Sequence, residues 1–259
     1  MTYALITGAS KGIGKAIAIE LAKKQNNILL VARNEVELKS TASEITKDHN
    51  VTCHFMALDL SQADAPKMLF DWCSKNSFNI DILVNNAGYG LSGSIDNYDF
   101  AAYQNMMQVN MSTPLNLTLL FLPMLKKQSK AYILNIASSA VYQAVPGLSI
   151  YAATKSFLFS MSRGLKFELR NSNVSVTVVN PGTTDTNFAN RAKVTNERAL
   201  KAAEKFNMTP TSVAKIAVEG MYARKAEIIP GFINKLGAFL AVILPKKILE
   251  GGAAGIYGV

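Results

Sequence analysis

Short apolar runs alternate with segments of helical periodicity along most of this chain, and that alternation constrains the fold more than any other feature. Strands separated by helices need right-handed crossover connections, which build a parallel sheet with helices on both faces. We therefore predict an α/β fold with a doubly wound parallel sheet. The expected strands are 3–7, 27–32, 51–58, 80–84, 131–137, 174–180 and 227–229, and the expected helices are 15–24, 35–47, 64–74, 100–127 and 149–170.

The composition favours one globular domain over residues 1–259 and a cytoplasmic location. Hydrophobic residues make up 49% of the chain and charged residues 17%, and we find no repeat or linker. Cys53 and Cys73 form neither a CxxC pair nor a disulfide framework, which favours a reducing compartment. The chain enters its first strand without the basic and apolar segments of a secretory signal. The net charge is +9, but the lysines are scattered, so we expect an anionic ligand rather than nucleic acid.

Three glycines, Gly8, Gly12 and Gly14, separate the first expected strand from the first expected helix. Glycine lets the backbone turn tightly and approach a pyrophosphate, and the helix N-terminus that follows offers free N–H groups. The spacing is GxxxGxG rather than the commoner GxGxxG. A plain strand–turn–helix connection is the alternative, but it needs about one glycine. The three glycines therefore favour a phosphate cradle.

The end of the second expected strand indicates which dinucleotide is bound. NAD-binding sites place an acid there to hold the ribose 2′-hydroxyl, but this strand ends in Val31-Ala32-Arg33-Asn34. The planar fork of Arg33 suits a phosphate, and Lys11 in the glycine turn adds a second cation. Both favour NADP(H) over NAD(H). The alternative is that Arg33 is only a solvated cation at a strand end.

Tyr151 and Lys155 are four residues apart, so in a helix they lie on one face, one turn apart. A neighbouring ammonium favours the phenolate and lowers the tyrosine pKa from about 10 towards neutrality. Such a tyrosine can exchange a proton with a substrate at physiological pH. The YxxxK pattern also occurs by chance, so it indicates catalysis only if the rest of the chain forms a cofactor site beside it.

Six separated motifs together resemble the short-chain dehydrogenase/reductase family, over roughly residues 1–190. The resemblance implies a single-domain, NAD(P)(H)-dependent oxidoreductase built on a Rossmann sheet of about seven parallel strands. No metal is expected. The motifs are Thr7-Gly8-Ala9-Ser10-Lys11-Gly12-Ile13-Gly14, Asn85-Asn86-Ala87-Gly88, Asn110, Ser138, Tyr151-x-x-x-Lys155 and Asn180-Pro181-Gly182.

The resemblance also assigns the catalytic residues. Tyr151 is expected to be the general acid or base, and Lys155 to lower its pKa and hold the nicotinamide ribose. Ser138 is expected to hydrogen-bond the carbonyl oxygen; its neighbour Ser139 is the alternative, but Ser138 takes the family position. Asn110 is expected to serve a proton relay, because Pro114 lies four residues on and leaves the Asn110 carbonyl without a helical partner. The alternative is that Pro114 simply begins a new helix.

The remaining cofactor contacts follow the same resemblance. Asp59 and Leu60 match the position that contacts the adenine, and the Asn85–Gly88 segment lies beside the cofactor, although alone it is typical of an ordinary turn. The loop from Pro181 to Thr186 is expected to close on the nicotinamide carboxamide. The full expected set is Gly8, Ser10, Lys11, Gly12, Ile13, Gly14, Arg33, Asp59, Leu60, Asn86, Ala87, Gly88, Tyr151, Lys155, Pro181, Gly182 and Thr186.

Two C-terminal regions lie outside the motifs. Residues 187–208 match the family's variable substrate lid, whose cations form either a solvated face or a dock for an anionic acyl carrier. The tail, 231–259, has an apolar stretch too short to span a bilayer; we expect it to pack on a second subunit or close the pocket rather than lie on a membrane. Gly251, Gly252 and Gly255 predict a poorly ordered end. The lid cations are Arg191, Lys193, Arg198, Lys201 and Lys205, and the expected apolar pocket residues are Tyr89, Leu91, Val141, Tyr142, Val145, Leu148 and Phe188.

Taken together, the sequence predicts an NADP(H)-dependent oxidoreductase that transfers hydride between nicotinamide and a carbonyl or secondary alcohol, with a lipophilic or acyl substrate. Two alternatives stay open: a cofactor-sensing protein without turnover, and a membrane-surface reductase of lipid ketones. The complete set of Ser138, Tyr151 and Lys155 argues against a sensor. The resemblance further implies a homodimer or homotetramer formed through helices such as 149–170.

Overall fold

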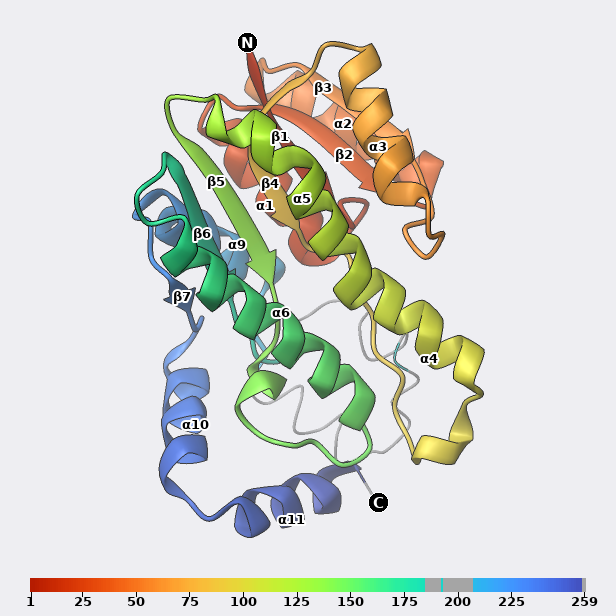
Figure 1. The fold of residues 1–259 in the computed structure, drawn as a ribbon, viewed down its shortest axis with the longest axis vertical. Coiled ribbons are helices and arrows are strands. Elements are labelled where there is room, and N and C mark those ends of the chain that lie inside the picture. The colour runs from red at the N-terminus through yellow and green to blue at the C-terminus, as the bar shows by residue number, and fades with distance from the viewer. Residues whose placement is uncertain (185–191, 193–206, 258–259) are drawn as a thin grey trace.

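The computed structural model describes residues 1–184, 192 and 207–257. Its centre is a seven-stranded parallel sheet with the strand order β3-β2-β1-β4-β5-β6-β7 (Figure 1). This confirms the predicted doubly wound α/β fold. The strands are β1 (Thr2–Thr7), β2 (Asn27–Ala32), β3 (Cys53–Ala57), β4 (Asn79–Asn85), β5 (Ala131–Ile136), β6 (Val174–Val179) and β7 (Glu227–Ile228).

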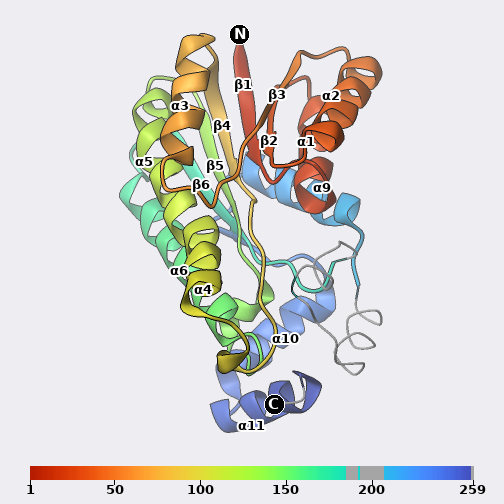
Figure 2. The same cartoon turned by 90° about the vertical axis from the view of Figure 1, so that its right-hand side faces the viewer.

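Helices cover both faces of the sheet, as the alternating pattern requires. One apolar cluster joins β1, β2 and β4 to α1, α2 and α9, and a second joins the other face to α3, α5 and α6. Figure 2 shows these two layers edge-on, with the sheet between them. The helices are α1 (Gly12–Lys23), α2 (Glu35–His49), α3 (Ala65–Lys75), α4 (Phe100–Met107), α5 (Thr113–Lys126), α6 (Ser149–Glu168), α9 (Pro210–Tyr222), α10 (Phe232–Ile243) and α11 (Lys246–Tyr257).

The strand order reverses at β1. Its neighbours are β2 on one side and β4 on the other, so the chain moves outward in opposite directions from this strand. In open parallel sheets, ligands bind outside the carboxyl ends of the strands at such a reversal. The carboxyl ends of β1 and β4 are where the glycine turn and the Asn85–Gly88 segment follow.

The long helix predicted over 100–127 changes its geometry in the middle. A π-helical turn, Gln108–Ser112, joins α4 to α5, and its last bond runs from the Thr113 N–H to the Gln108 carbonyl. Pro114 lies in the first turn of α5. The helix therefore departs from α geometry at the turn that contains Asn110, close to where the proline pattern places a break.

The C-terminal region differs most from the prediction. The helices α9, α10 and α11 were not predicted, and the expectation of a poorly ordered end is wrong, since Gly251, Gly252 and Gly255 lie within α11. A helical glycine costs about 1 kcal/mol relative to alanine. Packing offsets this cost here, because Ala253 is buried in an apolar cluster with Val145, Leu148 and Tyr151. No helix in the described part of the chain is long and apolar enough to span a bilayer.

Candidate active site

The glycine turn lies against the end of β4. Gly8 and Gly12 have φ angles of 65° and 60°, in the left-handed region that favours glycine. A Cβ at Gly8 would lie 2.9 Å from both the Ala87 Cα and the Asn86 Nδ2. The Asn86 amide donates to the carbonyls of Thr7 (2.9 Å) and Gly8 (3.1 Å), which fixes the turn. This is a concrete role for Asn86, which the resemblance placed only beside the cofactor.

Thr7 is a site residue to which the sequence motif assigned no role. Its buried hydroxyl donates to the Val84 carbonyl (3.2 Å) and accepts from the N–H groups of Asn86 (3.0 Å) and Ala87 (3.1 Å). One side chain thus ties the end of β1 to the chain that leaves β4. The only signal in the sequence is a hydroxyl at the strand end, directly before the first glycine.

The N-terminus of α1 fits a phosphate group. The helix begins at Gly12, no side chain caps it at Lys11, and its first turn contains no acidic residue. Uncapped N–H groups at a helix start form a favourable anion site. The Lys11 ammonium lies 3.5 Å from the Glu37 carboxylate, and the lysine is half-buried beside this helix start. Ser10 is buried within the same turn.

Arg33 and Asp59 follow two neighbouring strands at the same edge of the sheet. Arg33 is exposed after β2 and forms no ion pair with any residue that the structure describes. Asp59 follows β3 and accepts from the Ser61 N–H at 3.0 Å. Burial raises the pKa of Tyr89, while the charge of Arg33 lowers it and that of Asp59 raises it, so all three are within electrostatic reach. Leu60 is buried beside them and its carbonyl accepts from the Thr113 hydroxyl.

Tyr151 and Lys155 lie one turn apart near the start of α6, as their spacing predicts. Both are buried, and the Lys155 Nζ is 5.9 Å from the centre of the Tyr151 ring. The ammonium donates to the Ile136 carbonyl at 2.9 Å, at the end of β5. Burial lowers the pKa of Lys155 to about 8. The structure therefore brings the predicted phenol and ammonium together at the carboxyl end of the sheet.

Ser138 follows β5 two residues after the carbonyl that holds Lys155. Its Oγ accepts from the Ala140 N–H at 3.1 Å and caps the 3₁₀ turn Ser139–Tyr142. The neighbouring Ser139 donates its backbone N–H to the Pro181 carbonyl at 2.8 Å. The loops after β5 and β6 are thus bonded to each other beside the two serines.

Asn110 is buried in the π turn and joins three segments. Its amide donates to the carbonyl of Tyr89 (2.9 Å) and to the hydroxyl of Thr154 (3.0 Å), and its Oδ1 accepts from the Tyr89 N–H (3.1 Å). Thr154 precedes Lys155 on α6. A Cβ at Gly88 would lie 3.0 Å from the Lys155 Nζ and 3.1 Å from the Asn110 Oδ1, so a side chain here would be tightly packed against both. Asn110 and Lys155 are therefore neighbours across Gly88.

A second polar group connects the loops behind the site. The Tyr142 hydroxyl donates to Glu227 Oε1 at 2.5 Å, and the Asn180 amide donates to the Tyr142 oxygen (2.7 Å) and to Glu227 (3.0 Å). Burial and the Glu227 carboxylate raise the pKa of Tyr142. Arg163 on α6 lies 3.7 Å from the other Glu227 oxygen. Sequence separations of up to 85 residues kept this group out of the prediction.

The expected apolar pocket is found in part. Tyr89, Leu91, Val145 and Leu148 pack in one cluster with Tyr151. Val141 and Tyr142 do not belong to this cluster; they line a cavity beside α6 together with Val145, and the Tyr142 hydroxyl is bound by Glu227 and Asn180. Phe188, Thr186 and the lid cations Arg191, Lys193, Arg198, Lys201 and Lys205 lie outside the described residues.

The loop after β6 is covered by the C-terminal helices. A Cβ at Gly182 would lie 2.1 Å from the Asn234 Oδ1 of α10, so the glycine permits this close approach. Pro181 is buried beneath it. The predicted nicotinamide loop therefore contacts α10, an element that the sequence motifs do not include.

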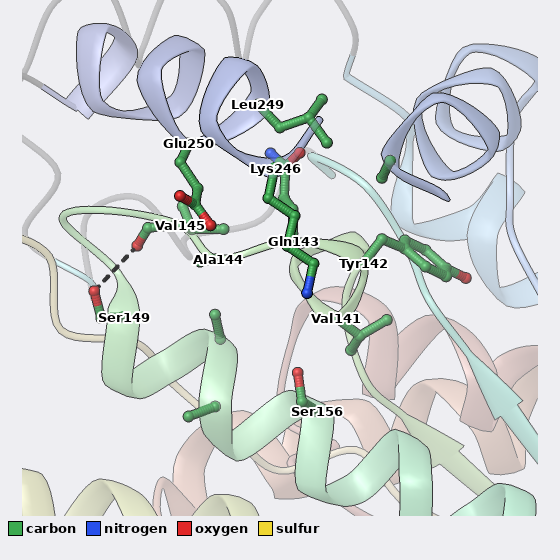
Figure 3. Close-up of a pocket in the computed structure, with 13 residues that line it drawn as sticks. Val141, Tyr142, Gln143, Ala144, Val145, Ser149, Ser156, Lys246, Leu249 and Glu250 are labelled. Atoms are coloured by element: carbon green, nitrogen blue, oxygen red, sulfur yellow. Dashed lines mark hydrogen bonds between the residues drawn. The ribbon is translucent and has the colours of Figure 1, made fainter. Parts of the chain in front are cut away.

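A cavity of about 410 Å³ lies between α6 and the C-terminal helices (Figure 3). Ser149, Ala152 and Ser156 line it from α6, and their spacing puts them on a different side of that helix from Tyr151 and Lys155. Lys246, Leu249 and Glu250 close it from α11. Ser138, Tyr151 and Lys155 are not among its lining residues, so this cavity is separate from the candidate catalytic residues.

Comparisons with known proteins show the family to which the chain belongs. The family model described as short chain dehydrogenase matches residues 2–197. An uncharacterized oxidoreductase of Staphylococcus epidermidis is 33% identical over 199 residues, which cover 77% of this chain and 85% of the relative. A short-chain dehydrogenase from Sphingobium yanoikuyae, solved in complex with NADPH, has a TM-score of 0.82 at 26% identity, covering 95% of this chain and 97% of the other.

A solved 7β-hydroxysteroid dehydrogenase shares the fold over the whole length. Its TM-score is 0.86 at 23% identity, and the match covers 100% of this chain and 97% of the other. The likeness therefore includes the C-terminal helices beyond the family motifs. The chain is an NAD(P)-dependent oxidoreductase acting on CH–OH or C=O groups, and it belongs to the short-chain dehydrogenase family.

Proposed function

We propose that this protein is an NADP(H)-dependent carbonyl reductase or alcohol dehydrogenase, with Ser138, Tyr151 and Lys155 as its catalytic residues. The observation that carries the proposal is the buried Tyr151–Lys155 pair on α6, with the ammonium held 2.9 Å from the Ile136 carbonyl. The pair lies at the carboxyl edge of the sheet, where the glycine turn also lies. A dinucleotide lying along that edge would bring its nicotinamide towards the phenol.

The chain's own residues fit such a cofactor. The uncapped start of α1 offers N–H groups to the diphosphate, and Gly8 and Gly14 hold the turn tight. When bound, the nicotinamide would supply or accept the hydride. The proposed contacts are Gly8, Ser10, Lys11, Gly12, Ile13 and Gly14 for the diphosphate, Asp59 and Leu60 for the adenine, Asn86, Ala87 and Gly88 beside the nicotinamide, Tyr151 and Lys155 for its ribose, and Pro181, Gly182 and Thr186 for its carboxamide.

The preference for NADP(H) rests on charge at the end of β2. Arg33 is exposed there, and the sequence places no acid at that position. A guanidinium binds phosphate through two parallel hydrogen bonds. The structural relative from Sphingobium yanoikuyae was solved with NADPH.

Residues on α6 and beside it would transfer the proton. Tyr151 would give its hydroxyl proton to the carbonyl oxygen in reduction and take it back in oxidation. Ser138 would donate a hydrogen bond to the same oxygen as negative charge develops. With its pKa lowered to about 8, Lys155 stays mainly protonated at pH 7 and so favours the phenolate. The carbonyl of Asn110, which receives no N–H from Pro114, would hold a water that returns protons through Lys155.

The apolar neighbours of Tyr151 support a lipophilic substrate. Leu91, Val145 and Leu148 pack in its cluster, and Tyr89 contributes a ring. An apolar wall beside the proton donor favours a ketone or acyl compound with a hydrophobic body.

The two adjacent serines give a matched test. We expect the protein to oxidise NADPH with at least one compound from a panel of hydrophobic ketones. The loss of NADPH absorbance measures this turnover. Ser138→Ala should lower kcat by about 100- to 1000-fold, the typical effect of removing one oxyanion donor, and Ser139→Ala should leave it within about twofold. Equal losses in both variants would contradict the assignment. NADPH binding without turnover on any compound would support a cofactor sensor instead.

A further inference from the structure

The helix α10 presents its large apolar side chains outward. Phe232, Phe239 and Val242 are 78%, 61% and 80% exposed, whereas Ala238 is the one residue of this helix that is buried. Its less exposed residues are Asn234, Ala238, Leu240 and Ala241, so Leu240 is the one large apolar side chain among them, and Asn234 donates to the Pro230 carbonyl at 2.7 Å. Amphipathic helices normally show the opposite arrangement, with the apolar side against the protein. Figure 1 shows α10 and α11 beyond the carboxyl end of the sheet.

These side chains form one continuous surface, which we call the α10 stripe. Residues 232, 236, 239 and 243 recur at the spacing of one helix face. Ile248, in the first turn of α11, is also exposed. Monomeric soluble proteins rarely leave such a contiguous apolar patch in water. The α10 stripe consists of Phe232, Ile233, Leu236, Phe239, Val242 and Ile243.

The charged residues of α10 and of the turn into α11 are all positive. Lys235, Lys246 and Lys247 are exposed, and the sequence has no acidic residue between Gly231 and Leu249. An apolar face bordered by lysines matches an anionic lipid surface, where the side chains enter the hydrocarbon boundary and the ammonium groups meet the phosphates. A two-fold contact with a second copy through this face would instead bring two sets of these lysines into one interface, and residues 232–249 hold no acidic side chain to pair with them.

We propose that the α10 stripe and its three lysines dock this protein on the surface of an anionic lipid bilayer. The helix has 12 residues, so it lies on the surface and does not cross. Because Asn234 of α10 lies against Gly182, docking brings the loop after β6 close to the bilayer. If the proposed reductase function holds, this deepens it: the hydrophobic carbonyl substrate is drawn from the lipid phase.

Vesicle flotation tests the docking directly and without cofactor. The wild-type protein should float with vesicles of phosphatidylcholine and phosphatidylglycerol, and much less with phosphatidylcholine alone. A Phe239→Glu/Val242→Glu variant should bind at least about tenfold more weakly, because two apolar anchors are lost. The control is Phe100→Glu, which alters a side chain that is 72% exposed at the start of α4 and should float like the wild type.

The lysines have their own variant. Lys246→Glu/Lys247→Glu should reduce binding to the anionic vesicles about tenfold or more and remove its sensitivity to salt. Circular dichroism and thermal unfolding establish that each variant is folded.

Three results would overturn the proposal. They are no flotation of the wild type, equal flotation of the α10 stripe variant, and a dimer that this variant converts to a monomer without any vesicle binding; the last would assign the stripe to a contact between copies. Turnover of a water-soluble ketone without vesicles is measured separately. If the wild-type protein shows no such turnover, the proposed function is contradicted and the docking result is unaffected.

Discussion

At the scale of single residues, the most unusual group is the ammonium of Lys155. It is buried, and its pKa is lowered to about 8 from the ordinary 10.5 because burial disfavours the charged form. In the proposed mechanism, this charge serves the neighbouring phenol of Tyr151. The spacing of Tyr151 and Lys155 predicted that they meet, but the carbonyl that holds the ammonium belongs to Ile136, 19 residues away, and no local pattern identifies it.

The lowered pKa predicts how stability depends on pH. Without cofactor, Lys155 loses its proton near pH 8 in the folded chain and near pH 10.5 in the unfolded chain. Burial of the ammonium therefore lowers the free energy of unfolding by its full amount below pH 8, and this penalty disappears as the pH rises from 8 to 10.5. The free energy of unfolding should gain about 2 kcal/mol from this group between pH 7 and pH 10. Urea unfolding of the wild type and of Lys155→Met at both pH values measures the gain, which the variant should lack. An identical pH dependence in the two proteins would contradict this prediction.

Arg33 carries the prediction of cofactor preference. Arg33→Ala should weaken NADPH binding by about 10- to 100-fold, the value of one or two charge-assisted hydrogen bonds, and leave NADH binding nearly unchanged. Calorimetric titration with both dinucleotides measures the difference. Arg170→Ala is the control, because Arg170 lies just after the end of α6, away from the end of β2. Its guanidinium carbon lies 4.1 Å from the centre of the Phe167 ring. A preference that survives in Arg33→Ala would place the 2′-phosphate contact elsewhere.

At the scale of elements, the π turn shows what the sequence could and could not predict. The position of Pro114 predicted that the Asn110 carbonyl loses its α-helical partner, and the structure has a π-helical turn there. The bonds from the Asn110 side chain to Tyr89 and Thr154 connect segments up to 44 residues apart, so local periodicity could not supply them. The same reason explains the Tyr142–Glu227 bond, which depends on how β7 pairs with β6.

Removing the Asn110 side chain should destabilise the protein. Asn110→Ala leaves the partly buried N–H and carbonyl of Tyr89 and the buried hydroxyl of Thr154 without this partner, and an unsatisfied buried group costs about 1–3 kcal/mol. We expect a loss of about 2–5 kcal/mol in urea unfolding. Asn105→Ala, an exposed position of the neighbouring α4, should change stability by less than about 0.5 kcal/mol. A similarly small change in both variants would show that the Asn110 bonds contribute little.

At the scale of the whole molecule, the alternation of strands and helices was enough to predict the sheet and its layers. It did not predict the tail, where α10 has its apolar side outward and α11 contains three glycines. Both features contradict the local rules that apply to a helix packed on its own domain. The strand reversal at β1 places the glycine turn at the carboxyl edge of the sheet, where the candidate catalytic residues also lie, and α10 contacts Gly182 in the loop after β6 at the same edge.

The central claim is that the Tyr151 hydroxyl supplies the proton to the substrate oxygen. The most direct measurement is kcat with NADPH and the best ketone for Tyr151→Phe, with Tyr3→Phe at the opposite end of the sheet as the control. We expect the Tyr151 variant to lose at least about 100-fold in kcat, the lower end of general acid catalysis, while its NADPH affinity and the control's turnover stay near wild type. Full turnover by Tyr151→Phe would contradict the account.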